Sequence, residues 1–189
     1  MSIYTKTGDE GTTKVFDKKS GQLVGIRKDS CTIAAIGAID ELNSFLGIIK
    51  AEILGYKDTK ILSEKKTAIK IEEIQGNLFT INSILAGANL RFSKTKTKKL
   101  EKEIDKWEGE LPVQKNFIFY GGTPRASQLF YARAICRRAE RALVVQSTEY
   151  KVPSELMMYI NRLSDYLFMM ARSENFKNKV KENFWKSSK

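Results

Sequence analysis

The sequence of 189 residues contains no histidine. This absence excludes histidine general acid–base catalysis, a Ser-His-Asp triad and every metal site that needs imidazole. The two cysteines, Cys31 and Cys136, are too few for a disulfide framework and lack the spacing of metal ligands, so each is expected to be a buried or idle thiol. Any catalysis must therefore rely on arginine, lysine, carboxylates, hydroxyls, backbone groups or a cofactor.

Residues that break helices are scarce as well. Three prolines and twelve glycines favour long helices over a β fold with many turns. No apolar run reaches the ~20 residues of a membrane-spanning helix. The first residues, MSIYTKTGDE, lack the apolar core of a signal peptide. We therefore expect a cytoplasmic protein with no membrane segment.

Positive charge, by contrast, is in excess, with a formal net charge of +11. Much of the lysine lies in two runs, 94–106 and 177–189. Such runs are usually solvated surface, although their field can also attract anionic ligands. Nucleic acid is the obvious competitor for that role, but the runs carry no recognised nucleic-acid-binding signature.

Apolar residues recur at alternating spacings of three and four, which predicts amphipathic helices. This pattern predicts helices over about 32–55, 63–89, a stretch that begins at 124, and 153–176. The lysine-rich stretch 94–108 is expected to form a further helix. Five helices with short connections predict an all-α, up-and-down bundle with one helix at its side. No repeat or linker divides the chain, so residues 1–189 are expected to form a single domain.

The stretch 121–141, GGTPRASQLFYARAICRRAER, organises the rest of the chain. Thr123 is a good N-cap and Pro124 suits the first helical position. The helix then carries four arginines close together: Arg133, Arg137, Arg138 and Arg141. Because like charges at this spacing repel, these side chains need carboxylates or phosphates as partners, unless they form only a solvated basic face.

Residues 1–30 are expected to be irregular. From position 4 to 14 the chain reads YTKTGDEGTTK, in which Gly8 and Gly11 permit tight turns that direct backbone N–H groups at a phosphate. Lys6 and Lys14 add positive charge. The spacing is not that of a P-loop, and a plain surface turn is the simpler interpretation of these residues alone.

Three further features allow more than one interpretation. Asp40, beside the apolar seam of the first helix, is either a surface acid or the partner of an arginine in the 133–141 stretch. The run 117–120, FIFY, is either a core anchor, the default for most of it, or a pocket wall. Arg162 and Asp165 can pair at i, i+3, and the charged tail after Phe176 is expected to be frayed.

Four motifs occur together and in order: TKTGDEGTT at 5–13, GAIDELNS at 37–44, GG…ARAICRRAER within 121–141, and NRLSDYLF at 161–168. This combination resembles the ATP:cob(I)alamin adenosyltransferases of the PduO type over nearly the whole chain. The resemblance implies a five-helix bundle with a ferritin-like up-and-down core, assembled as a homotrimer. It also implies transfer of the 5′-deoxyadenosyl group of ATP to cob(I)alamin, with Mg²⁺ on the triphosphate that is released.

The resemblance implies roles for individual residues. ATP would lie between the N-terminal loop of one subunit, within 1–30, and the RRAER helix of its neighbour. The implied ATP-site residues are Thr5, Lys6, Thr7, Gly8, Thr13, Lys14, Lys28, Arg137, Arg138, Glu140, Arg141 and Asn161, with Asn161 also close to the metal. Asp40 and Arg133 match a salt bridge between subunits, and Phe117 matches an aromatic residue that helps to displace the lower ligand of cobalamin. Arg137, Phe117, Asp40 and Arg133 are thus the implied catalytic residues.

Cob(I)alamin is itself a strong nucleophile, so the lack of histidine is no obstacle to this reaction. The protein needs to supply positioning, phosphate neutralisation and a pocket with little water. Tyr120, where many relatives have proline, leaves the shape of the cobalamin pocket open. A reductase and an adenosylcobalamin-dependent acceptor enzyme are the expected partners. Two rivals are a non-catalytic carrier of adenosylcobalamin and a nucleic-acid-binding protein, which would leave the glycine-threonine loop unexplained.

Overall fold

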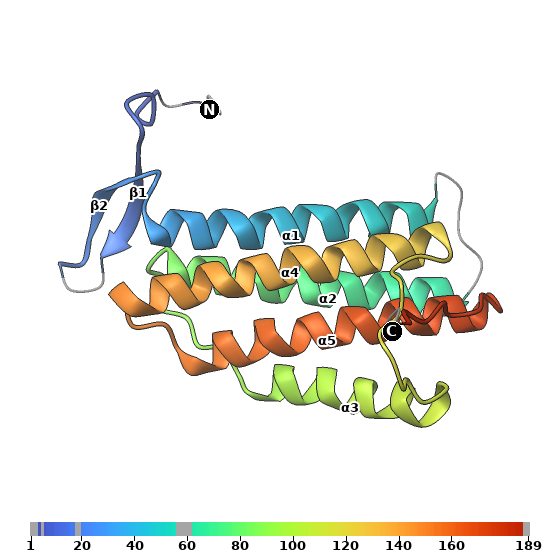
Figure 1. Ribbon diagram of the computed structural model, residues 1–189. Coiled ribbons are helices and arrows are strands. Elements are labelled where there is room, and N and C mark those ends of the chain that lie inside the picture. The colour runs from blue at the N-terminus through green and yellow to red at the C-terminus, as the bar shows by residue number, and fades with distance from the viewer. Residues whose placement is uncertain (1–3, 5, 18–19, 56–61, 187–189) are drawn as a thin grey trace.

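The computed structural model describes residues 4, 6–17, 20–55 and 62–186, and in these ranges it contains five helices and one β-hairpin (Figure 1). Four helices form the bundle: α1 (Cys31–Leu54), α2 (Leu62–Leu85), α4 (Pro124–Glu149) and α5 (Ser154–Lys177). Helix α3 (Thr95–Glu110) packs along α5. The prediction of an all-α five-helix bundle is confirmed.

Consecutive helices run in alternate directions along the bundle (Figure 1). Helix α1 packs against both α2 and α4, and α4 packs against both α1 and α5. The seam positions predicted from the sequence are the residues that these contacts bury, because a 3-4 spacing keeps them on one face of each helix. The fully buried seam residues include Ile39, Leu42, Leu46, Ile71, Leu78, Ile81, Leu129, Leu143, Ile160 and Leu163.

Among the described helices, α1 has the length and the apolar composition of a membrane-spanning helix. The core helix of a bundle passes the same test, and the buried side chains of α1 fit that explanation. Ile39, Leu42 and Leu46 are fully buried in the hydrophobic core that the helices share.

The prediction that residues 1–30 are irregular is wrong for the hairpin. Strands β1 (Thr12–Asp17) and β2 (Gln22–Arg27) pair antiparallel, and the hairpin docks on the end of the bundle where the Phe16 N–H donates to the Ala86 carbonyl at 2.9 Å. Gly87 makes that approach possible, since a Cβ there would lie 1.8 Å from the Phe16 oxygen. The strands bury little of their apolar surface, which is why their alternation is weak in the sequence.

The prediction of a frayed tail is also wrong for residues 178–186. After α5, the Val180 N–H donates to the Asn175 carbonyl at 2.9 Å, and the chain turns back along the bundle. Phe184 then forms an isolated antiparallel bridge with Ile118.

This bridge explains why the apolar run 117–120 is mostly exposed, contrary to the expectation that most of it anchors the core. Extended backbone points successive side chains to opposite sides. Ile118 therefore faces the core and is 7% exposed, whereas its neighbours Phe117 and Phe119 are 76% and 61% exposed.

Helix α4 begins as its sequence predicts. The Thr123 hydroxyl accepts from the Ala126 N–H at 3.1 Å, and Pro124 is the first helical residue. The turn before it depends on Asn175 of α5, whose amide accepts from the Thr123 N–H at 3.0 Å and donates to the Gly121 carbonyl at 2.8 Å. Between these contacts, Gly122 has a φ of 112°, a conformation that disfavours a side chain.

Gly122→Ala should therefore lower the free energy of unfolding by about 2–4 kcal/mol, through backbone strain and overpacking. The added Cβ would lie 2.1 Å from Asn175 Oδ1. Gly109→Ala is the matched control, because nothing lies within 4 Å of a Cβ at that helical position, and alanine there should stabilise by up to about 1 kcal/mol. Denaturant unfolding of both variants measures the difference, and equal stabilities would contradict the role given to this turn.

Candidate functional site

The arginines of α4 differ in what they contact. Arg138 is exposed and forms an ion pair with Glu41 of α1. Arg137 and Arg141 are exposed too, but neither has a hydrogen bond or ion pair to any residue in the described ranges. Two guanidinium groups on the surface of α4 are thus available to bind an anion from outside the chain.

Glu140 lies among these arginines but contacts α5 instead. Its carboxylate accepts from the Asn161 amide nitrogen at 2.6 Å. This bond leaves two side-chain oxygen atoms beside the arginines: the amide oxygen of Asn161 and the second carboxylate oxygen of Glu140. The predicted roles of both residues toward ATP and metal stay predictions.

Arg133 has aromatic surroundings. Its guanidinium lies 5.3 Å from the ring centroid of Tyr120 and 5.5 Å from that of Phe168, and it donates to the Tyr120 hydroxyl at 3.2 Å. Tyr120 is thereby held against α4. Because cations are attracted to ring faces, this arrangement fixes the Arg133 side chain without a carboxylate.

Asp40 lies exposed on α1 and is not paired with Arg133 within the chain. Among the residues that the structure describes, it has no ion pair or side-chain hydrogen bond. The predicted Asp40–Arg133 salt bridge between subunits therefore remains a prediction. The other ion pair expected from the sequence is confirmed, since Arg162 Nη1 lies 2.7 Å from Asp165 Oδ2.

The N-terminal turns form a compact unit in front of β1. The Gly11 N–H donates to the Gly8 carbonyl at 3.3 Å, and Lys6 and Gly11 both have positive φ. Lys28, just after β2, braces these turns with two hydrogen bonds. Its side-chain ammonium donates to the Gly8 carbonyl at 2.7 Å, and its backbone N–H donates to the Gly11 carbonyl at 2.8 Å.

The remaining residues predicted for the ATP loop lie on or beside this unit. Thr7 lies in the turns, Thr13 and Lys14 belong to β1, and Thr5 lies outside the described residues. The turns project from the bundle beyond the start of α1 (Figure 1). No hydrogen bond or ion pair within the described ranges links them to the arginines of α4. Among the described residues, the two halves of the predicted ATP site are therefore not joined by a hydrogen bond or ion pair.

Phe117 lies at a cavity of ≈ 590 Å³ on the loop between α3 and α4. Gln114, Lys115, Asn116, Trp185 and Lys186 complete its lining. Sequence reasoning missed Trp185, because it lies in a lysine-rich tail that was expected to be frayed.

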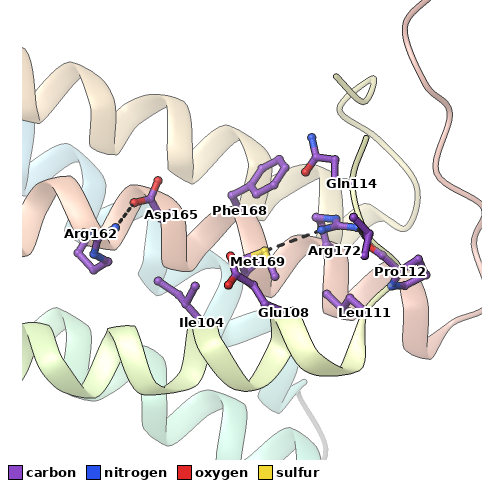
Figure 2. A pocket seen from close by; sticks show the side chains of 11 residues that line it. Ile104, Glu108, Leu111, Pro112, Gln114, Arg162, Asp165, Phe168, Met169 and Arg172 are labelled. Carbon is purple, nitrogen blue, oxygen red and sulfur yellow. Dashed lines mark hydrogen bonds and ion pairs between the residues drawn. The ribbon is translucent and has the colours of Figure 1, made fainter. Parts of the chain in front are cut away.

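A second cavity of ≈ 470 Å³ lies on the other side of this loop, between α3 and α5. Figure 2 shows Phe168 and Met169 of α5 facing it, with Arg172 beside Pro112 and Gln114 at its rim. Gln114 lines both cavities. The loop 112–117 thus contributes to the lining of both cavities.

The cysteines do not take part in this chemistry. Burial raises the pKa of the Cys136 thiol far above its usual range, with a further rise from the charges of Glu140 and Asp165, and the thiol donates to the Ile160 carbonyl at 3.3 Å. Burial and the nearby Glu149 carboxylate raise the pKa of the Cys31 thiol. Both cysteines are free, and thiolate catalysis is disfavoured at each.

Comparisons with known proteins agree with the motifs and the fold. The sequence profile of the cobalamin adenosyltransferase family matches residues 3–174. A corrinoid adenosyltransferase from Bacillus subtilis is 38% identical over 184 residues, which cover 95% of this chain and 90% of that protein. The corrinoid adenosyltransferase PduO from Citrobacter freundii is 38% identical over 182 residues, so this chain spans only 50% of that longer protein.

A solved structure gives the same result. It is a variant of the PduO-type ATP:corrinoid adenosyltransferase from Lactobacillus reuteri, complexed with cobalamin and ATP. It is 33% identical in sequence, with a TM-score of 0.85, and the match covers 98% of this chain and 100% of that one. This chain belongs to the cobalamin adenosyltransferase family.

Proposed function

We propose that this protein is an ATP:cob(I)alamin adenosyltransferase. The Co(I) electron pair attacks the ribose C5′ of ATP, a cobalt–carbon bond forms, and the C5′–O bond breaks. Triphosphate leaves with the electrons of that bond, and adenosylcobalamin is the product. The observation that carries this proposal is the pair of exposed arginines on α4, Arg137 and Arg141, which have no hydrogen bond or ion pair among the described residues of a chain of this family.

The direct test is optical. With ATP present, the spectrum of cob(I)alamin should convert to that of adenosylcobalamin for many turnovers per subunit, and without ATP it should not. Binding of ATP and cobalamin with no conversion would instead support the rival, a non-catalytic carrier.

The active site is proposed to lie between subunits of a homotrimer. Support comes from the N-terminal turns, which have no hydrogen bond or ion pair to the α4 arginines among the described residues, and from Asp40, which lacks a partner among them. Helices α1 and α4 also carry exposed apolar side chains: Ile48, Tyr131, Val144 and Val145. A neighbouring subunit packed on these helices would cover apolar area and bring its own turns to the arginines.

Mg²⁺ fits this site as a companion of the triphosphate. It prefers oxygen ligands and keeps several waters, so one or two protein oxygens suffice. No cluster of three acidic or thiol side chains exists among the described residues, which makes a dedicated protein cage for the ion a poor fit. Asn161 and Glu140 would supply the protein oxygens, and the ion would neutralise phosphate charge.

The corrinoid is proposed to bind at the loop that carries Phe117. A large exposed aromatic ring beside a cavity suits a pocket wall, and the ring would displace the lower ligand of Co(II) and exclude water. Loss of that ligand makes one-electron reduction to Co(I) easier. A reductase that delivers the electron, an acceptor enzyme for the product and a cytoplasmic location complete the proposal.

Arg137→Ala should weaken ATP binding and turnover by about 10- to 150-fold, because it removes a charge-assisted phosphate contact worth about 1.5–3 kcal/mol. Lys102→Ala, which removes one exposed positive charge from α3, is the control for the change in net charge. ATP affinity and turnover are measured for both variants. Values within twofold of wild type for Arg137→Ala would exclude it as a nucleotide ligand.

Asp40→Ala and Arg133→Ala should be coupled in activity and in trimer stability. Each single change leaves the opposite charge without its partner across the interface, and the cost grows with burial. A double-mutant cycle separates this effect from the loss of the Tyr120 and Phe168 contacts, which also occurs in Arg133→Ala. Additive effects would rule out a direct pair.

Phe117→Ala should leave the melting temperature, the trimer and ATP affinity unchanged, because its ring is 76% exposed in the structure. Conversion of cob(II)alamin under reducing conditions should fall strongly, and turnover of preformed cob(I)alamin should fall less. A loss of ~3–5 kcal/mol of stability, as for a core phenylalanine, would contradict the pocket-wall role.

A further inference from the structure

We infer that Glu182 is a positioning residue for the reaction: through Arg172 it holds the C-terminal segment 178–186 against the loop that presents Phe117. This inference deepens the proposed function and rests on it for the role of Phe117. Three anchors, all at the end of α5 or just after it, carry the inference.

The first anchor is a buried ion pair. The Arg172 side chain is 5% exposed, and it binds both carboxylate oxygens of Glu182, with Nε–Oε1 at 2.6 Å and Nη2–Oε2 at 3.0 Å. Nη2 also donates to the Pro112 carbonyl at 2.8 Å, and Figure 2 shows Arg172 lying beside Pro112. One guanidinium thus joins α5, the tail and the start of the Phe117 loop.

The second anchor is backbone pairing between the tail and the loop. The Phe119 N–H donates to the Asn183 carbonyl at 2.9 Å, and the Trp185 N–H donates to the Phe117 carbonyl at 2.8 Å. These two bonds flank the Ile118–Phe184 bridge. Because side chains alternate along extended backbone, seating Ile118 in the core forces Phe117 to point outward.

The third anchor closes the far end of the loop. Asn175, one turn after Arg172 on α5, binds Gly121 and Thr123 through its amide. The backbone carbonyl of Asn175 also accepts from the Val180 N–H, and this bond turns the tail back toward the loop. The loop is therefore fixed at Pro112, at 117–119 and at 121–123.

The middle anchor depends on Glu182, because among the described residues that carboxylate alone joins the tail to Arg172. A charge-assisted bidentate contact is strong, and removal of one partner leaves a buried guanidinium with an unmet charge. Loss of the pair should release the tail, so that Phe117 is no longer held in one direction. ATP binding, which involves other elements, should be preserved.

The test compares Glu182→Gln, which keeps the size of the side chain but removes its charge, with Glu110→Gln as the control. Glu110 forms an exposed ion pair with Lys106 at 3.7 Å on neighbouring α3. We expect Glu182→Gln to lower cob(II)alamin conversion at least fivefold. The fraction of bound Co(II) without a lower ligand, measured by electron paramagnetic resonance, should also fall at least fivefold. ATP affinity and turnover of preformed cob(I)alamin should stay within twofold, and the control should match wild type throughout.

Two further variants keep the test decisive. Glu182→Asp retains the charge and should recover part of the lost Co(II) signal. In the double variant Phe117→Ala/Glu182→Gln, conversion should fall no further than in Phe117→Ala alone, since Glu182 acts through Phe117. Independent, multiplying losses would overturn the inference, as would a wild-type Co(II) signal in Glu182→Gln or a parallel fall in every activity.

Hydrogen exchange separates this inference from the proposed function, because it needs no substrate. Protection of the Phe119 and Trp185 amides should fall in Glu182→Gln and not in Glu110→Gln. Unchanged protection would overturn the role of Glu182 even if adenosyl transfer is confirmed. Absence of ATP-dependent conversion in the wild-type protein would overturn the proposed function instead, whatever the exchange shows.

Discussion

Helix α4 has to satisfy two opposite demands, and the rest of the structure depends on how it does so. One face is fully buried against α1 and α5, with Ala132, Cys136, Ala139 and Leu143 at the contacts. The other face holds arginines that repel one another. The packed face fixes the helix rigidly, so the arginines cannot move apart, and other groups have to offset their charge. Glu41 relieves Arg138, aromatic rings hold Arg133, and Arg137 and Arg141 are left for an anion.

This constraint explains how a chain without histidine can serve a group transfer. Arginine keeps its charge at every physiological pH and grips phosphate oxygens in a fixed geometry. The nucleophile in the proposed reaction is cobalt, and the leaving group is a triphosphate that departs with negative charge. No side chain has to gain or lose a proton at the reacting carbon. What remains for the protein is to hold charge in place and exclude water, and a rigid helical bundle suits that task.

The sequence predicts the bundle well because its signals are local. The 3-4 seams and the Thr123-Pro124 start of α4 need only neighbours along the chain, and both appear as predicted. The hairpin and the tail were missed for the opposite reason. Ile118 pairs with Phe184, and Phe16 docks at Ala86, across long separations that leave no periodic pattern. The sequence also places Phe117 in an apolar run without showing that its ring faces outward, since pairing with the tail decides the direction.

The site divides in the same way. Motifs predict which residues take part, but the fold of one chain does not determine the contacts of residues such as Asp40, which has no ion pair or side-chain hydrogen bond among the described residues. Within the chain, the position of Phe117 is set by side chains at one end of α5, none of which belongs to the motifs before position 169. Arg172 and Asn175 both face the loop because they lie three residues apart on one helix, and residues at that spacing share a face. One turn of α5 therefore holds both ends of the loop and, through Glu182, its middle. The proposed corrinoid end of the site is thus coupled to the C-terminal segment, whereas the proposed nucleotide end depends on α4 and the N-terminal turns.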